Sequence, residues 1–314
     1  MSILPRTIEV HPGNEFVIHT KVKVGEGCFK EVKKAVTIEG EGQKPRTTIR
    51  ALEKPHPDET PRHKLCRNTE MAVVTHPKLK DESELVTGKA SKIDVFNNKG
   101  QKIGEKLVVL MENYELGSLE GMQSKLTDPQ MIMVARDIAK GTAALHKNGI
   151  VHDDLKPANV LLKKMKDGTM KAGVADFGCA WFYGVNPARR KDLVNYSYVT
   201  GDRAFLPPEI HNKSGSGPET DIWAMGCTMY CMWKKVDSPP VFSLITGNFS
   251  SSKAKKMRTN IEREISKAEP GPRKEYMEIM LSALTLEQAN RPSATAIQSK
   301  LDALIAKYPN FFKQ

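Results

Sequence analysis

The first third of the chain consists of short runs in which apolar and polar residues alternate, a pattern typical of strands with one buried face. Residues 16–24 alternate in this way, Gly25-Glu26-Gly27 interrupts the run, and the alternation resumes over 32–38. A helix is predicted over 62–74, ahead of a His-Pro pair that ends it. Further strands are predicted over 47–52, 91–96 and 107–111.

The rest of the chain has the apolar spacing of helices. One helix is predicted to begin near Asp128-Pro129, with Asp128 as its N-cap and the proline in its first turn. Residues 220–233 are apolar almost all round, which predicts a helix buried at the centre of a lobe. Terminal helices are expected over 272–284 and 292–306. The whole pattern predicts an α+β protein with a sheet-rich first part and a helical second part.

The composition is that of an ordinary globular protein. Of the 314 residues, 39% are hydrophobic and 27% are charged, and the formal net charge is +11. No apolar run approaches the roughly 18 residues that span a bilayer, and the first residues lack the features of a secretory signal. The five cysteines form no C-x-x-C pair, which disfavours a zinc site or a disulfide framework. We expect a cytoplasmic protein, acting in the cytoplasm of a host cell if the chain belongs to a pathogen.

Three basic runs could contact nucleic acid, anionic lipid or an acidic protein surface. No aromatic residues interleave with these runs, and no nucleic-acid motif accompanies them. We therefore interpret them as solvated faces and expect no nucleic-acid partner. The runs lie at 163–166, 189–191 and 253–258.

The residues best suited to chemistry lie in the string IVHDDLKPANVLL, which begins at residue 150, and in the Asp-Phe-Gly motif at 176–178. Asp154 is a carboxylate that can orient and deprotonate a hydroxyl group. Asn159 and Asp176 offer oxygen atoms to Mg²⁺, and Lys156 offers a cation to a transferring phosphoryl group. The two strings together resemble the catalytic loop and the metal-binding motif of the eukaryotic-type protein kinases.

This resemblance implies a two-lobed kinase fold, with a small antiparallel-sheet N-lobe that has one main helix and a larger helical C-lobe. The domain is expected over 14–308, divided into lobes at 14–112 and 113–308, with short tails at 1–13 and 309–314. The resemblance also implies ATP and Mg²⁺ as cofactors and Ser or Thr of a protein as the acceptor, because the segment KPAN is similar to the serine/threonine type of catalytic loop.

Other motifs of the family occur along the chain. The stretch MENYELGSL resembles the hinge whose backbone binds adenine, which assigns Met111, Glu112 and Tyr114 to the ATP site. Late motifs resemble the end of the activation segment, the start of the central helix and the late arginine motif. In the family the arginine and glutamate of these motifs pair, so a buried ion pair is implied between Arg291 and Glu209.

The nucleotide-binding strands depart from the family. Gly25 and Gly27 match the first two loop glycines, but Lys30 replaces the third, and Arg50 stands where the third-strand lysine is usual. The with-no-lysine kinases place a lysine in the glycine loop in a similar arrangement, which implies that Lys30 reaches the phosphates; a solvent-facing lysine is the alternative. Glu70 is the candidate partner of Arg50 or Lys30, with Glu59 or a solvated role for Glu70 left open.

Control of activity is also expected to differ. Asp153 replaces the arginine that in many kinases binds a phosphate on the activation segment, so activity is not expected to depend on such a phosphate. Asp202 could accept a hydrogen bond from Lys156.

The alternative function is that of a pseudokinase, which binds nucleotide or acts as a scaffold. Arg50, Asp153 and Asp202 favour this alternative, whereas the intact catalytic and metal-binding motifs oppose it.

Overall fold

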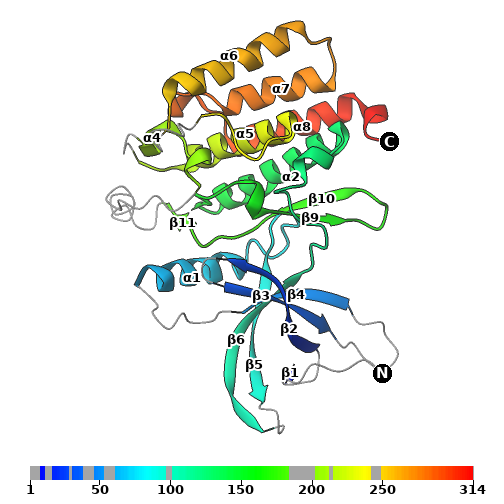
Figure 1. Cartoon of the computed structure of the whole chain (residues 1–314), viewed down its shortest axis with the longest axis vertical. Helices are drawn as coiled ribbons and strands as arrows, with labels where there is room; N and C mark the ends of the chain where they lie inside the picture. The colour runs from blue at the N-terminus through cyan, green and yellow to red at the C-terminus, as the bar shows by residue number, and fades with distance from the viewer. Residues whose placement is uncertain are drawn as a thin grey trace. The chain divides into compact units, whose positions relative to one another are not determined.

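The chain divides into two compact units in the computed structural model (Figure 1). The first unit comprises 1–81, 86–115 and 176–178, and the second comprises 82–85, 116–175 and 179–314. The first is built mainly on strands and the second mainly on helices, which confirms the predicted α+β class. The structure describes residues 8–10, 16–27, 30–37, 46–52, 61–96, 101–183, 202–211, 215–241 and 249–313.

The first unit is a closed antiparallel barrel with the strand order β1-β2-β3-β4-β6-β5, together with the helix α1 (Pro61–Val74). All the strands predicted for this part of the chain are present. The prediction that Gly25-Glu26-Gly27 breaks a strand was wrong: β2 continues through Gly27, and these three residues pair in regular order with residues 30–32 of β3. The strands are β1 (Ile8–Val10), β2 (Phe16–Gly27), β3 (Lys30–Thr37), β4 (Arg46–Leu52), β5 (Gly88–Phe96) and β6 (Lys102–Glu112).

The second unit is a set of helices beside two small sheets. β7, β9 and β10 form one sheet, with β9 in the middle, and β8 pairs with β11. Lys163, from a basic run expected to be solvated, is only 8% exposed because it lies on the central strand β9. The helices are α2 (Asp128–Lys147), α4 (Pro208–His211), α5 (Pro218–Lys234), α6 (Ser251–Lys267), α7 (Pro272–Ala283) and α8 (Ala294–Lys307). The short strands are β7 (Gly117–Ser118), β8 (Ile150–Val151), β9 (Val160–Lys164), β10 (Met170–Val174) and β11 (Trp181–Phe182).

The N-cap of α2 lies one residue earlier than the sequence pattern predicted. Thr127, rather than Asp128, is the N-cap: its hydroxyl accepts from the backbone N–H of Gln130, and the Gln130 side chain accepts from the backbone N–H of Thr127. This reciprocal capping box leaves Asp128 inside the first turn, where its charge favours the helix dipole.

α5 lies at the centre of the second unit, as predicted, with most of its side chains buried. In Figure 1 it lies among α7, α8 and α2. Trp223 is fully buried, and the hydroxyl of the fully buried Tyr276 on α7 donates a 3.0 Å hydrogen bond to the backbone carbonyl of Met229. Cys227 and Cys231 are also buried on this helix, where they pack as small apolar side chains.

α6 was not predicted from the sequence. Only Ala254, Met257 and Ile261 are buried on it, so its apolar face is one narrow line among polar and charged residues. The sequence pattern over 253–258 was interpreted as a solvated basic run, because the polar and charged residues around these three positions hide their apolar spacing.

In the part of the chain that the structure describes, no helix combines the length and apolar character needed to cross a membrane.

Candidate active site

The loop between β8 and β9 brings three predicted catalytic residues together. β9 pairs with β10 as an antiparallel hairpin, and Pro157 opens the short 3-10 turn that leads the chain into it. Nζ of Lys156 lies 3.2 Å from Oδ2 of Asp154. Nδ2 of Asn159 donates to the same oxygen at 2.9 Å. The Asp154 carboxylate is therefore held by a cation and an amide at once.

Asn159 is a suitable magnesium ligand because of how its amide is oriented. Nδ2 donates a second hydrogen bond, of 2.7 Å, to the backbone carbonyl of Asp154. With its amide nitrogen engaged on Asp154, Oδ1 is the atom that Asn159 can offer to a ligand. Mg²⁺ prefers hard oxygen donors of this kind. The residue thus fits the ion that the motif implies.

Burial and mutual contact set the ionisation of Asp154 and Lys156. Burial raises the pKa of the Asp154 carboxyl, against the opposing charges of Lys156 and His152. Burial alone would lower the pKa of Lys156, but the charge and hydrogen bond of Asp154 raise it above its usual value. Asp154 is consequently a stronger base than a solvated aspartate, and Lys156 stays charged.

Asp202 has a different partner from the one expected. Its Oδ1 accepts a 3.0 Å hydrogen bond from the backbone N–H of Ala204 and so caps a short 3-10 turn. Within the described residues Lys156 contacts Asp154 instead, and the charge of Asp202 only adds to the rise in the pKa of Lys156.

Asp221, in the first turn of α5, holds the backbone of the catalytic loop. Its two carboxylate oxygens accept from the backbone N–H groups of His152 and Asp153, each at 2.9 Å. Nε2 of His146, near the end of α2, lies 2.8 Å from Oδ2 of Asp221. Burial would raise the pKa of Asp221, but the hydrogen bond and charge of His146 lower it. The sequence pattern assigned no role to Asp221; the signal for one was a carboxylate within the almost wholly apolar segment 220–233.

Asp153 adopts a backbone conformation that few residues favour, with φ of 61°. Its Oδ1 accepts a 2.8 Å hydrogen bond from the hydroxyl of Ser216, just before α5. Burial raises the pKa of Asp153 to about 7, and the charges of Asp221 and Asp154 act in the same direction. Where the resemblance implies an arginine, this chain therefore has a half-buried acid that Ser216 binds directly.

The segment that leads to Asp176 is tied to the catalytic loop. The backbone N–H of Ala175 donates to the carbonyl of Asn159 at 2.9 Å, and Nε2 of the buried His152 lies 2.9 Å from the carbonyl of Ala175. Asp176 follows at once with φ of 62°, a left-handed conformation that reverses the chain direction locally. Phe177 is fully buried. The catalytic loop and the residue before the Asp-Phe-Gly motif are thus held together within the second unit.

The buried carboxylate of Glu84 fixes the strand before Asp176. Oε1 of Glu84 lies 2.9 Å from Nζ of both Lys140 and Lys171. Burial would raise the pKa of Glu84, but these two hydrogen bonds lower it to about 2. The carbonyl of Glu84 accepts from the N–H of Val174 at 2.9 Å. A Cβ at Gly141 would lie 2.6 Å from that carbonyl, so glycine is needed for this close approach.

The implied ion pair between Arg291 and Glu209 is confirmed. The guanidinium donates to both carboxylate oxygens, at 2.5 and 2.8 Å, and both side chains are buried. It also donates to backbone carbonyls, including that of Thr285 at 2.8 Å. The pair fixes α4, which carries Glu209, to the helical core of the second unit.

Four predicted ATP-binding residues lie on the barrel strands. Gly25 and Gly27 are in β2, where Gly27 pairs with Lys30 at the start of β3. Arg50 is in β4 and pairs with Lys33. The side chains of Lys30 and Arg50 lie outside the described part of the structure, so their contacts with phosphate stay predictions.

The other predicted ATP-site residues are placed by α1 and by the end of β6. Glu70 is half-buried on α1. Met111 is half-buried and Glu112 exposed on β6, and Tyr114, which follows them, is 4% exposed. Their roles in binding ATP stay predictions.

Comparison with known proteins agrees with this arrangement. A model of the family described as "Protein kinase domain" matches residues 18–301, which is most of the chain. The chain is 37% identical to mitogen-activated protein kinase kinase kinase 17 of Arabidopsis thaliana over 155 residues, or 46% of this chain and 38% of that protein. It is 34% identical to serine/threonine-protein kinase PLK2 of Mus musculus over 131 residues, or 41% of this chain and 18% of that protein.

A third relative covers more of the chain. Serine/threonine-protein kinase CST20 of Candida albicans (strain WO-1) is 29% identical over 210 residues, which is 65% of this chain and 15% of that protein. The matched stretches amount to less than half the length of each of these curated relatives.

Proposed function

We propose that this chain, which belongs to the protein kinase family, transfers the γ-phosphoryl group of ATP to serine or threonine of a protein substrate. In this proposal the kinase domain spans about 14–308. Asp154 is the catalytic base, and Asn159 and Asp176 hold Mg²⁺. The observation that carries the proposal is the contact of Lys156 and Asn159 with a single carboxylate oxygen of Asp154.

The geometry of the loop suits phosphoryl transfer to a hydroxyl. Asp154 accepts the hydrogen bond of the acceptor hydroxyl and takes its proton as the oxygen attacks the γ-phosphorus; the bond from this phosphorus to the β,γ-bridging oxygen breaks, and ADP leaves with that oxygen. Lys156 stays protonated beside it and stabilises the negative charge that develops on the transferred group. Asp221 fixes the loop backbone, so the base and the cation are positioned before the substrate arrives. Bound Mg²⁺ would neutralise charge on the phosphates.

The type of acceptor follows from the catalytic loop and from the relatives. Lys156 is followed by Pro-Ala-Asn, which is similar to the serine/threonine type of loop. Two of the similar proteins named above are serine/threonine-protein kinases. These observations support Ser or Thr as the acceptor rather than Tyr.

The second candidate function is that of a pseudokinase. Arg50 in place of the usual lysine and the half-buried acid Asp153 in place of the usual arginine favour it. Asp154 and Asn159 oppose it, because a chain that only binds partners has no need to hold a base, a cation and an amide in contact.

Thermal unfolding with ATP, with and without Mg²⁺, separates the two functions when it is combined with an autophosphorylation assay. The kinase proposal predicts stabilisation by Mg-ATP, incorporation of phosphate into the wild type, and loss of both the Mg²⁺ dependence and the incorporation in Asp176→Ala. Stabilisation by nucleotide with no phosphate incorporated into any acceptor would favour the pseudokinase. Wild-type turnover in Asp176→Ala would overturn the metal assignment.

A further inference from the structure

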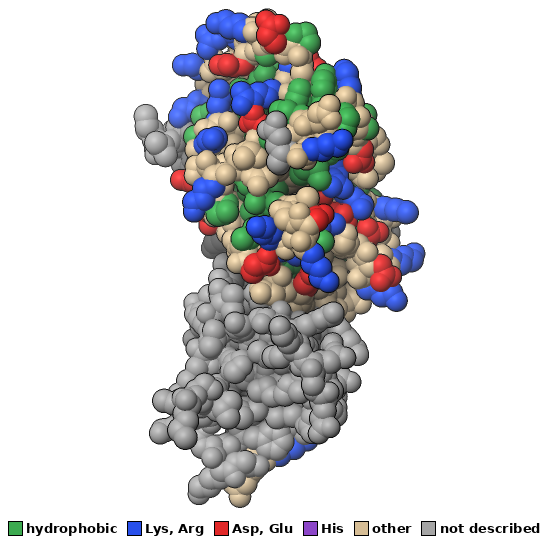
Figure 2. Space-filling view, turned by 90° about the vertical axis from the view of Figure 1, so that its right-hand side faces the viewer, with side chains coloured by type: hydrophobic (Ala, Val, Ile, Leu, Met, Phe, Trp, Pro, Cys, Tyr) green, Lys and Arg blue, Asp and Glu red, His purple; other side chains and the backbone are tan. Residues whose placement is uncertain are grey.

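Glu84 is a buried acidic residue that the proposed mechanism does not use. It lies in the segment 82–85, which belongs to the second unit although the residues before and after it belong to the first. Charged side chains of both signs are interspersed on the surface (Figure 2), and such exposed charges contribute little to stability. Glu84 differs because it is only 1% exposed, so solvent and salt screen its contacts much less.

The carboxylate of Glu84 bridges a helix and a strand. Its Oε1 accepts hydrogen bonds of 2.9 Å from Nζ of Lys140 on α2 and from Nζ of Lys171 on β10. Nζ of Lys171 also donates to Oγ of Ser83 at 2.9 Å, so two residues of the segment hold this lysine. In Figure 1, β10 lies beside α2. One carboxylate oxygen therefore ties the strand to the helix.

The backbone of the same segment covers the free edge of β10, which is an edge strand of its sheet. The carbonyl of Glu84 accepts from the N–H of Val174 at 2.9 Å, and Leu85 pairs with Val174 in a parallel bridge. Further along this edge, the N–H of Ala172 donates to Oδ2 of Asp137 at 2.9 Å. Edge N–H groups of β10 thus find partners in the segment and in α2, which fixes the strand in place.

β10 in turn holds the backbone of Asn159. Val174 pairs with Val160, the residue directly after Asn159. The N–H of Ala175 donates to the carbonyl of Asn159 at 2.9 Å. Glu84 therefore contacts β10 on one edge at the same level where the other edge holds Asn159. A displacement of the strand at this level would move the Asn159 backbone and, with it, the amide oxygen.

Stability alone does not account for a buried glutamate here. Removing an ionised carboxylate from water is costly, and its attraction to a cation often only offsets that cost. Within the part of the chain that the structure describes, the buried Oε2 of Glu84 accepts no hydrogen bond, which adds to the cost. The position that Glu84 gives to β10 explains the residue better.

We propose that Glu84 is a positioning residue that sets the place of Asn159 for binding Mg²⁺. The inference rests on the proposed role of Asn159 as a magnesium ligand. Glu84 acts through β10, because its carboxylate holds Lys171 and its carbonyl holds Val174. Mg²⁺ demands near-ideal octahedral geometry, so a displaced ligand weakens its binding. Loss of the Glu84 contacts should therefore lower the affinity for metal more than the affinity for nucleotide.

Metal affinity tests the proposal. The probe is Mn²⁺, titrated into the full chain with saturating AMP-PNP and followed by electron paramagnetic resonance of the free ion. Glu84→Gln and Lys171→Met each weaken the bridge and should raise the Kd for Mn²⁺ at least about threefold. Binding of AMP-PNP without metal should change by less than about twofold. The double variant should bind Mn²⁺ no more weakly than Glu84→Gln, because both changes act through one bridge.

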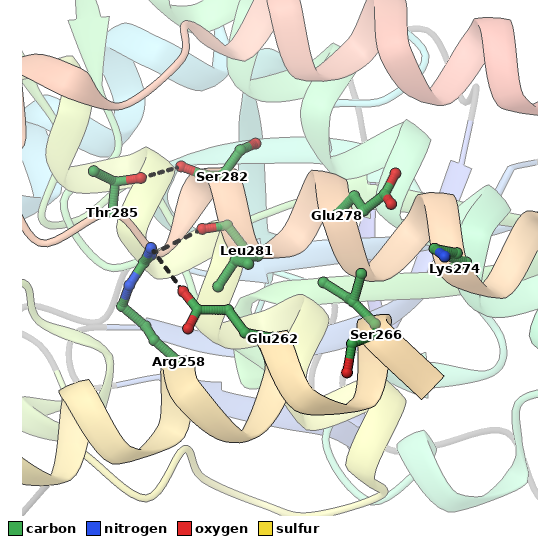
Figure 3. Close-up of a pocket in the computed structure, with 9 residues that line it drawn as sticks. Arg258, Glu262, Ser266, Lys274, Glu278, Leu281, Ser282 and Thr285 are labelled. Carbon is green, nitrogen blue, oxygen red and sulfur yellow. Dashed lines mark hydrogen bonds and ion pairs between the residues drawn. The ribbon is translucent and has the colours of Figure 1, made fainter. Parts of the chain in front are cut away.

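Glu262→Gln is the matched control, because it removes one negative charge from the same unit. Glu262 is exposed on α6 beside the groove between α6 and α7, where its Oε1 lies 3.9 Å from Nη2 of Arg258 (Figure 3). In Figure 1, α6 lies at the far end of the second unit from β10. The Kd of this variant for Mn²⁺ should stay within about twofold of the wild type, as expected of a distant site.

A measurement on the metal-free protein separates this inference from the proposed function. With ¹⁵N-labelled asparagine, the side-chain amide signals of Asn159 are assigned by their loss in Asn159→Asp. They should shift in Glu84→Gln and Lys171→Met and stay in place in Glu262→Gln. Unchanged signals, or a wild-type Kd for Mn²⁺ in both bridge variants, would overturn the positioning role alone. A wild type that binds no Mn²⁺ would overturn the proposed metal site and this inference together.

Discussion

The hydroxyl of Ser216 donates a 2.8 Å hydrogen bond to the carboxyl of Asp153. This bond joins the catalytic loop to the residue that comes just before the N-cap of α5. The backbone of Asp153 is held by the same part of the chain, because its N–H donates a hydrogen bond to the Asp221 carboxylate on α5. The loop is thus held by contacts within the second unit and without a cation at position 153.

Activity should therefore not require phosphate on the activation segment. Asp153 offers a phosphate no cation, and the contacts of Ser216 and Asp221 already position the loop. Protein produced without upstream kinases and treated with phosphatase should keep most of its activity in a peptide assay. Activity that returns only when Thr200 or Ser197 carries phosphate would contradict this.

Asp153 should also make stability depend on pH. Burial raises its pKa from 3.8 to about 7, so the unfolded chain loses this proton at lower pH than the folded protein does. The stability from this group is complete below about pH 4 and is lost as pH rises through about 7. Relative to Asp153→Asn, the free energy of unfolding of the wild type should fall by about 1–2 kcal/mol between pH 5 and 8. Urea unfolding across this range measures it, and a constant difference would exclude the shifted pKa.

The ion pair between Glu209 and Arg291 should contribute strongly to stability. Glu209→Gln leaves a buried guanidinium without its countercharge and should cost about 3–5 kcal/mol of unfolding free energy. Glu275→Gln is the matched control, because Glu275 pairs with the exposed Lys307, and it should cost less than about 1 kcal/mol. Denaturant unfolding measures both variants. Similar losses of unfolding free energy would show that burial does not make the pair of Glu209 and Arg291 more stabilising than an exposed pair.

The glycine-loop lysine should matter more than the third-strand arginine. A cation placed next to the phosphates stabilises charge in the transition state, so Lys30→Met should lower kcat at least about tenfold, or roughly 1.4 kcal/mol. Arg50→Met should do less harm. Both variants are compared on one peptide substrate. Wild-type kcat in Lys30→Met together with loss of activity in Arg50→Met would show that Arg50, rather than Lys30, supplies the cation.

Much of the fold could be predicted because its signals are local. The alternating strands of the barrel and the apolar α5 follow directly from residue spacing. α6 could not be predicted, because its only buried residues form a narrow line whose pattern the surrounding charges hide. Thr127 was missed as an N-cap because Asp128 beside it is an equally good capping residue, and only the backbone geometry decides between them.

The site was predictable where its residues are close in sequence. Asp154, Lys156 and Asn159 lie within six positions, and the structure brings them into contact. The supports of the loop are distant in sequence: Asp221 and Ser216 reach it from the second half of the chain, and no spacing rule connects them with Asp153. Such contacts depend on tertiary packing, which the sequence pattern alone does not specify.

The most direct test of the account compares phosphoryl transfer by the wild type and Asp154→Asn. An asparagine at this position keeps the shape of the side chain but cannot take a proton from the acceptor hydroxyl. With γ-labelled ATP, Mg²⁺ and a Ser/Thr peptide library, the wild type should incorporate label into Ser or Thr. The variant should be slower by at least about a hundredfold while its thermal unfolding is unchanged within a few degrees. Equal incorporation by the two proteins would contradict the assignment of Asp154 as the catalytic base.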